Sequence, residues 1–106
     1  MALKILDIQF SLGSEKIKIE KLVKKKNLEN IKNSTGIPWL YRVRKNEEII
    51  SMSLKAARKI FKNKKKKLIE ILILVTQTPK TNIPPNSFII HKELKLSNKC
   101  MVFDVN

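Results

Sequence analysis

The chain has 106 residues, a formal net charge of +14 and a single cysteine. A chain of this length forms one domain at most and buries only about 60–65% of its unfolded surface, which leaves a thin core. One cysteine excludes an internal disulfide and a cysteine-rich metal site, and no apolar run approaches the roughly 18 residues of a membrane span. Because the start of the chain also lacks the features of a signal peptide, we expect a cytoplasmic protein without a membrane segment.

The first segment, Ala2 to Phe10, alternates well enough to predict a β-strand. Ser11 to Ser14 contains a glycine and predicts a turn. The lysine-rich stretch Glu15 to Asn27 follows, and its apolar residues have helical spacing. These residues are Ile19, Leu22 and Val23. The stretch therefore predicts a short amphipathic helix.

A break follows at Asn33 to Pro38, because glycine and the residue before a proline both disfavour a continued helix. The next stretch predicts a helix, since its apolar residues recur at i, i+4, i+7 and i+11. These residues are Ile50, Leu54, Ala57 and Phe61. The run Asn63 to Lys67 then predicts a solvated connection to the next strand.

The last third of the chain begins with a strand and a turn. Ile71 to Val75 is an unbroken apolar run, which is typical of a central strand covered on both faces. Thr76 to Pro84 supplies the turn. A helix begins at Pro84 and Pro85, because proline fits the first helical turn, where its missing N–H would have had no partner.

A helix and a second strand complete the chain. Ile90 and Leu94 lie four residues apart on one face of the helix, with Phe88 nearby. Cys100 to Val105 alternates as a second strand. The order strand, helix, strand predicts two parallel strands joined by a helical crossover.

Few side chains suggest chemistry of their own. Cys100 lies in a predicted strand, so we interpret it as a small core hydrophobe, with a reactive thiol as the alternative. His91 falls on the charged side of its helix, beside Lys92 and Glu93, and is interpreted as a surface residue. Trp39 and Tyr41 flank a basic stretch and form either a stacking surface for a nucleotide or, the interpretation we favour, two aromatics that cover a loop.

The charge comes from 20 lysines and only three arginines. The lysines are dispersed, with runs only at Lys24–Lys26 and Lys64–Lys67, whereas recognition of bases and phosphates favours arginine. We therefore interpret most of the charge as solvated surface, with docking of an acidic protein as an alternative. Any affinity for nucleic acid is expected to be weak and independent of sequence.

A strand ending in TQTP, a following PP and helix, and a strand reading FDV closely resemble the 3-oxoacyl-[acyl-carrier-protein] synthase III family of the thiolase superfamily. The TGI triplet at 35–37 and the AARK helix follow the same order. The resemblance implies an α/β fold, part of the first half of a thiolase-like αβαβα arrangement, with a mixed, mostly parallel sheet and covering helices. Residues 1–106 would then be a single partial domain, the N-terminal portion of a synthase that is a homodimer at full length.

The resemblance also implies an activity. Enzymes of this family load an acyl group from a thioester onto a cysteine and condense it with malonyl-acyl carrier protein, as in fatty acid biosynthesis. The implied partners are acyl carrier protein and an acyl-thioester substrate, with no cofactor and no metal. In the family pattern FDVxxxC the cysteine is the sixth residue after the phenylalanine. Counting from Phe103 places it at position 109, beyond Asn106, so no catalytic residue is expected within the chain, and Asp104 is interpreted as structural.

Three positions bear on the substrate. Members that take acyl-coenzyme A carry an aromatic residue and an arginine where this chain has Asn30 and Ser34. This difference weakens coenzyme A as the acyl donor and leaves an acylated carrier protein or a specialised substrate open. Ile83 stands where a residue of the family, often phenylalanine, closes the partner's acyl pocket across the dimer. The smaller isoleucine implies branched or somewhat longer acyl chains.

Three interpretations therefore stand at the level of the sequence. The first is an N-terminal segment of a decarboxylating condensing enzyme. The second is a basic nucleic-acid-binding module, which predicts binding that falls steeply with salt. The third is a truncated gene product without activity.

Overall fold

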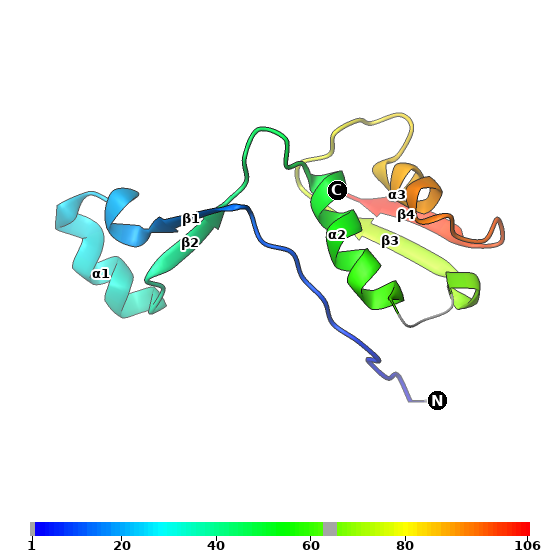
Figure 1. Cartoon of the computed structure of the whole chain (residues 1–106), viewed down its shortest axis with the longest axis horizontal. Helices are drawn as coiled ribbons and strands as arrows, with labels where there is room; N and C mark the ends of the chain where they lie inside the picture. The colour runs from blue at the N-terminus through cyan, green and yellow to red at the C-terminus, as the bar shows by residue number, and fades with distance from the viewer. Residues whose placement is uncertain (1, 63–65) are drawn as a thin grey trace. The chain divides into compact units, whose positions relative to one another are not determined.

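The computed structural model describes residues 2–62 and 66–106. The chain divides into two compact units, each with its own pair of strands (Figure 1). We call Leu12–Glu47 the antiparallel unit, and Met1–Ser11 together with Glu48–Asn106 the parallel unit. Within the described residues, no helix combines the length and the apolar character needed to cross a membrane. The single partial domain stays a prediction.

The antiparallel unit is built on strands β1 (Glu15–Lys18) and β2 (Trp39–Arg42). Between them lie a 3-10 turn, Ile19–Lys21, and helix α1 (Lys25–Thr35). The prediction of one helix over Glu15 to Asn27 is wrong. Within β1 the side chain of Ile17 is buried while those of Lys16 and Lys18 are exposed, which is the alternation of a strand with one covered face.

Both glycines of the chain are needed where they stand in this unit. Gly36 ends α1 in the left-handed region, at a φ of 63°, which confirms the predicted break. Gly13 lies against the end of β2, where an added Cβ would come within 2.4 Å of the Arg42 carbonyl group. Any side chain there would force the two segments apart.

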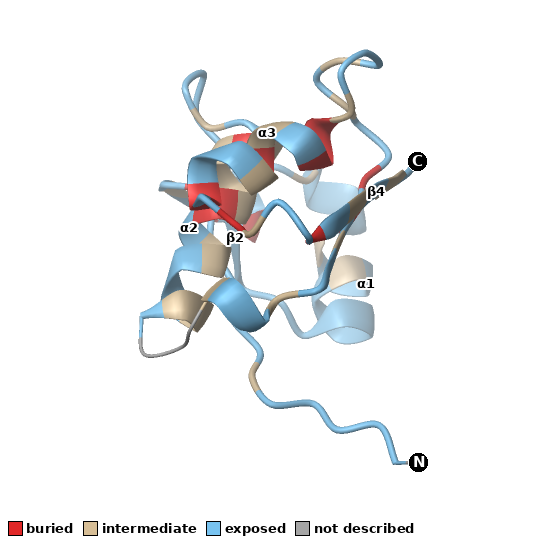
Figure 2. Ribbon diagram, turned by 90° about the vertical axis from the view of Figure 1, so that its right-hand side faces the viewer, coloured by how far each residue is buried: buried red, intermediate tan, exposed pale blue. Residues whose placement is uncertain are grey.

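The parallel unit contains strands β3 (Ile71–Val75) and β4 (Met101–Val105), which pair in parallel with Ile71 opposite Met101. Helix α3 (Asn86–Leu94) lies between them in sequence, as predicted for a helical crossover. Helix α2 (Ile49–Phe61) confirms the predicted apolar stripe, and a short 3-10 helix, Lys66–Leu68, precedes β3. Buried residues gather on α2 and α3 (Figure 2).

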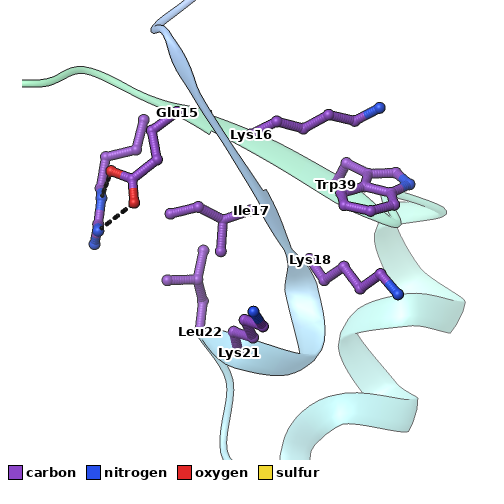
Figure 3. Close-up of a pocket in the computed structure, with 8 residues that line it drawn as sticks. Glu15, Lys16, Ile17, Lys18, Lys21, Leu22 and Trp39 are labelled. Atoms are coloured by element: carbon purple, nitrogen blue, oxygen red, sulfur yellow. Dashed lines mark hydrogen bonds and ion pairs between the residues drawn. The ribbon is translucent and has the colours of Figure 1, made fainter.

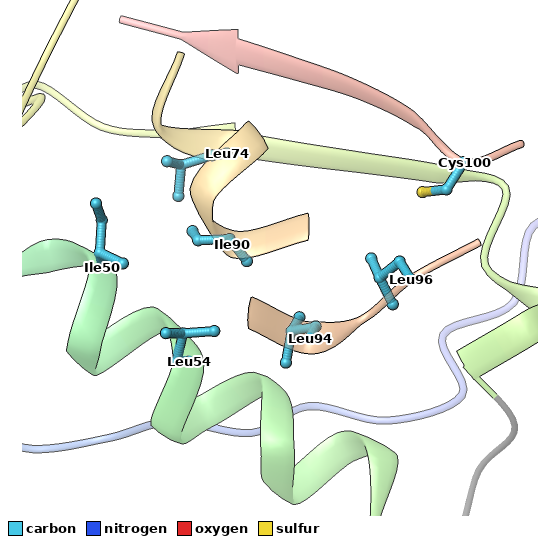
Figure 4. Close-up of a cluster of buried hydrophobic side chains, with 7 residues drawn as sticks. All are labelled: Ile50, Leu54, Leu74, Ile90, Leu94, Leu96 and Cys100. Atoms are coloured by element: carbon cyan, nitrogen blue, oxygen red, sulfur yellow. The ribbon is translucent and has the colours of Figure 1, made fainter. Parts of the chain in front are cut away.

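One cluster of buried side chains forms the core of the parallel unit (Figure 4). It contains Ile50, Leu54, Leu74, Ile90, Leu94, Leu96 and Cys100. Ile90 and Leu94 are the predicted buried face of α3, and Leu94 is only 1% exposed. Cys100 is a free, buried cysteine in this cluster, which confirms its interpretation as a core hydrophobe.

The helices cover only one face of the β3–β4 pair. Leu74 on that face belongs to the core, whereas Ile73 and Val75 are 58% and 70% exposed. The opposite face carries six apolar side chains: Ile71, Ile73, Val75, Met101, Phe103 and Val105. The prediction that β3 is covered on both faces is therefore wrong for the described residues.

Two other predictions have a different outcome. Ala2 to Phe10 has no regular secondary structure, because no strand of the described residues pairs with it, so the predicted first strand is wrong. The predicted solvated connection, Asn63 to Lys67, lies partly outside the described residues. Lys66 and Lys67 begin the 3-10 helix before β3.

Candidate functional site

The carboxyl ends of β3 and β4 meet at one edge of the parallel pair. Val75 lies opposite Val105 there, and the turn Thr76 to Pro84 leaves from the same edge. α3 begins directly after this turn. In α/β proteins with parallel strands, ligands bind outside this edge, because loops and helix N-termini converge on it.

Asp104 of β4 caps the first turn of α3. Its carboxylate accepts hydrogen bonds from the backbone N–H groups of Asn86 (2.7 Å) and Ser87 (2.8 Å), both of which are fully buried. Burial of Asp104 opposes its ionisation, but the hydrogen bonds from Ser87 and Asn86 outweigh it and lower the pKa of Asp104. The structural interpretation of Asp104 is confirmed.

The Asn86 side chain fixes the turn before α3. Its Oδ1 accepts from the backbone N–H groups of Lys80 (3.2 Å) and Thr81 (3.4 Å), and its Nδ2 donates to the Thr81 carbonyl oxygen (2.9 Å). Asn86 is not among the residues that the sequence patterns singled out. A polar pair directly after two prolines, with an aspartate on the neighbouring strand, is the signal that could have found it. Ile83 lies in this turn and is 90% exposed, and its role stays a prediction.

His91 differs from its predicted place on the open surface. It is half-buried, and its Nε2 lies 3.0 Å from the Ser97 carbonyl oxygen. The reason is the left-handed turn at Lys95, with a φ of 52°, which ends α3 and leads the chain back past the helix.

A second candidate region lies on the antiparallel unit. Lys18 stands opposite Trp39 and Lys16 opposite Tyr41, so all four side chains share one face of the strand pair. We call these four residues the Trp39 face. The Lys16 and Lys18 Nζ atoms lie 4.5 Å and 5.4 Å from the centroid of the Trp39 ring (Figure 3). The aromatics are therefore strand residues with cationic neighbours, and their interpretation as cover for a loop is wrong.

The carboxylates near the Trp39 face already have partners. Glu15 pairs with Arg42 through two contacts of 3.1 Å, and this hydrogen bond from Arg42 lowers the pKa of Glu15. Glu20 pairs with Lys32, which is the main cause of its lowered pKa, with a smaller contribution from the charge of Lys18. A cavity of about 550 Å³ opens beside these residues, lined by Glu15, Lys16, Ile17, Lys18, Lys21, Leu22, Trp39 and Arg42.

The remaining predicted positions do not form a site. Asn30 and Ser34 are exposed on α1, where the Ser34 hydroxyl donates to the Ile31 carbonyl oxygen. In the part of the chain that the structure describes, no three His, Cys, Asp or Glu side chains come together as they would around a metal ion. Whether the protein uses a metal or cofactor stays at the level of expectation.

The sequence and the structure of the chain were both compared with those of known proteins. No protein-family model matches the chain. Over 73 residues the chain is 30% identical to beta-ketoacyl-[acyl-carrier-protein] synthase III of Neisseria gonorrhoeae, an alignment that spans 67% of this chain and 23% of that protein. The 3-oxoacyl-[acyl-carrier-protein] synthase III of Aquifex aeolicus superposes with a TM-score of 0.80 at 25% identity, over 96% of this chain and 34% of that one. The chain is related to the 3-oxoacyl-[acyl-carrier-protein] synthase III enzymes.

A second type of synthase has a similar fold over nearly the whole of this chain. The HMG synthase of the curacin biosynthetic pathway superposes with a TM-score of 0.85 at 19% identity, over 97% of this chain and 27% of that one. That protein has also been solved in complex with a donor acyl carrier protein. The described residues thus match part of a thiolase-like α/β fold, as the resemblance implied. The chain spans about a quarter to a third of the length of these synthase relatives.

Proposed function

We propose that this chain is the N-terminal part of an acyltransferase that condenses an acyl thioester with malonyl-acyl carrier protein, with loss of CO₂. The observation that carries the proposal is the β3–α3–β4 arrangement with Asp104 bound to the start of α3, in a chain related to synthase III. The full-length protein would be a homodimer that acts in fatty acid or related lipid biosynthesis.

The Asp104 cap supports the proposed position of the nucleophile. It holds the carboxyl end of β4 against the start of α3, so residues that follow Val105 would leave the sheet at the edge where the turn Thr76 to Pro84 lies. A cysteine at position 109 would therefore emerge at this edge. Its thiolate would be favoured at a helix N-terminus, and backbone N–H groups would stabilise the oxyanion of the acyl intermediate.

The chain offers less support for coenzyme A as the donor. Asn30 and Ser34 present no aromatic ring or guanidinium group on α1. An acyl group delivered by a carrier protein remains the alternative within the same proposed reaction.

The gene itself provides the sharpest test. The reading frame should continue past the Asn106 codon and encode a cysteine at position 109. The protein translated from it should release CO₂ from malonyl-acyl carrier protein when given an acyl thioester, and a serine at position 109 should abolish covalent acylation. A frame without this cysteine would overturn the proposal and favour a truncated product.

The 106-residue chain is the control for that experiment. We expect it to show no condensation and no acylation of Cys100, because this thiol is buried in the core directly before β4, at no helix N-terminus that would favour its thiolate. Incubation with radiolabelled acyl-coenzyme A and acyl-carrier protein, with Cys100→Ser alongside, checks this. Label on Cys100 would show that the assignment of position 109 is wrong.

Ile83 provides a separate test of the substrate. Its side chain is 90% exposed, so Ile83→Phe should leave the fold of the described residues intact. In the longer protein this change should shift the preferred primer toward shorter acyl chains, because the larger ring shortens the pocket. Competition between primers of different length measures the shift, with Ile83→Val as the matched control. An unchanged profile would remove Ile83 from the acyl pocket.

A further inference from the structure

We infer that a second copy of this chain covers the exposed face of the β3–β4 pair, so that two identical sheets pack face to face. Each strand contributes three apolar side chains to this face, because alternate residues of a strand point to the same side. We call these six side chains the apolar sheet face: Ile71, Ile73, Val75, Met101, Phe103 and Val105. The inference goes beyond the proposed function, since it concerns the 106-residue chain and needs no condensing chemistry.

The first argument is the size of the face. Its six side chains are between 49% and 70% exposed, whereas Leu74, on the other side of β3, packs against the helices (Figure 4). Together the six expose roughly 600 Å² of apolar surface, which is at the upper end of what a monomeric protein shows in one patch. Two copies would bury about 1,200 Å², which reaches the lower end of the range for specific protein interfaces.

The second argument is the lack of positive charge in this part of the chain. None of the 20 lysines and three arginines lies in β3, in β4 or among the four residues that directly flank these strands, Glu70, Thr76, Cys100 and Asn106. A nucleic acid or an anionic membrane is held by basic side chains, so this face lacks the groups that such partners need. Two copies of a chain with a net charge of +14 repel each other least where that charge is missing.

The third argument is geometric. Both copies present the same ribbon of two parallel strands, so their faces twist with the same hand and can pack about 10 Å apart, as the two layers of a sandwich do. The register places Ile73 opposite Phe103 at the centre of the face. A two-fold axis through this centre brings the same side chains of both copies together, which gives a closed dimer rather than an open chain of copies.

Sedimentation of the 106-residue chain tests the inference. We expect a monomer at about 1 μM and a dimer at about 100 μM, as for a small interface with a dissociation constant on the order of 10 μM. Raising the salt from about 50 mM to about 500 mM should tighten the dimer several-fold, because salt screens the repulsion between two positively charged copies and leaves the apolar contact intact. A chain that stays a monomer at the higher concentration, or whose association weakens with salt, would overturn the inference.

Paired substitutions, measured at the higher salt, locate the contact. Ile73→Lys with Phe103→Lys places two charges at the centre of the face and should weaken the dimer at least about 100-fold. Ile83→Lys with Phe88→Lys adds the same charge at two exposed apolar side chains outside the face and should change the dissociation constant less than about threefold. Ile83 belongs to the dimer contact of the proposed function, so the control pair also separates the two contacts. An equal loss in both pairs, or a loss only in the control pair, would overturn the inference.

A milder pair guards against loss of the fold. Ile73→Thr with Phe103→Thr removes apolar surface but introduces β-branched residues, which strands favour, and should weaken the dimer about tenfold. An unchanged dimer in this pair would show that the face is not the contact. Assemblies larger than a dimer would also overturn the inference, in favour of pairing at the free edges of the two-stranded sheet.

These outcomes are independent of the condensing reaction. Failure of the 106-residue chain to form a dimer would leave the test at position 109 untouched. Absence of a cysteine at position 109 would equally leave the dimer measured on the 106-residue chain valid.

Discussion

The two units of this chain differ in what they bury and what they expose. The parallel unit holds the seven-residue core cluster and the Asp104 cap. In the antiparallel unit, the buried apolar side chains of the described residues are Ile17 and Ile19, while ten basic and four acidic residues among 36 positions give a charge of +6. Most of the buried apolar side chains of the described residues therefore lie in the parallel unit, whereas the antiparallel unit carries its charge on an open surface.

The relationship to synthase III fits this division. The segments TQTP, the double proline and FDV all lie in the parallel unit. There Asp104 of FDV accepts a hydrogen bond from the start of α3, and Asn86 holds the turn that precedes the helix. Asn30 and Ser34, which are exposed on α1, lie in the antiparallel unit. Substitutions that break buried hydrogen bonds cost stability, whereas substitutions at exposed positions usually cost little.

The largest expected effect separates the two units by their packing. Leu94→Ala should destabilise the parallel unit by about 3 kcal/mol, because it leaves a cavity in the core at a side chain that is 1% exposed. Leu40→Ala in β2, where the side chain is 38% exposed, should cost the antiparallel unit less than about 1 kcal/mol. Amide hydrogen exchange measures each unit separately. Equal losses would show that the difference in burial does not translate into stability.

How far the sequence predicts this fold depends on whether a signal is local. The β3–α3–β4 segment was predicted correctly in order and pairing, because an apolar run, two prolines and an alternating strand each carry their own evidence. Ala2 to Phe10 is predicted as a strand but is not one, and β2 is a strand that the sequence patterns do not predict. The reason is that the formation of a short strand depends on its pairing partner more than on its own residues. The Trp39 face shows the same limit, because Lys18 and Trp39 become neighbours only through the strand register.

The second prediction concerns the charge of Asp104, which is specific to the parallel unit. The pKa of Asp104 is lowered in the folded chain from an ordinary value of 3.8. A lowered pKa means that the ionised carboxylate stabilises the fold at neutral pH, and that this contribution is lost as the pH falls through the lowered value, below about pH 4. Asp104→Asn should therefore destabilise the parallel unit by about 2 kcal/mol at pH 7, since two charge-assisted hydrogen bonds become neutral ones.

Urea unfolding at pH 7 and at pH 3 tests this dependence. The difference between wild type and Asp104→Asn should shrink at pH 3. Glu93→Gln, which removes an exposed carboxylate from α3, is the matched control and should show little effect at either pH. If Asp104→Asn loses the same free energy of unfolding at both pH values, the shape of the side chain rather than its charge stabilises the start of α3.

The smallest expected effect compares how the two units end a helix. α1 and α3 both end in the left-handed region, but α1 uses Gly36 and α3 uses Lys95. Gly36→Ala should cost about 1 kcal/mol from backbone conformation alone, because an added Cβ at Gly36 meets no atom within 4 Å. Lys95→Gly relieves the same strain but increases the entropy of the unfolded chain and removes a favourable charge at the helix end. Lys95→Ala removes that charge but keeps the backbone strain. Urea unfolding should therefore show Lys95→Gly to be more stable than Lys95→Ala by about 1 kcal/mol. Equal stabilities of the two variants would show that α3 ends without strain at Lys95.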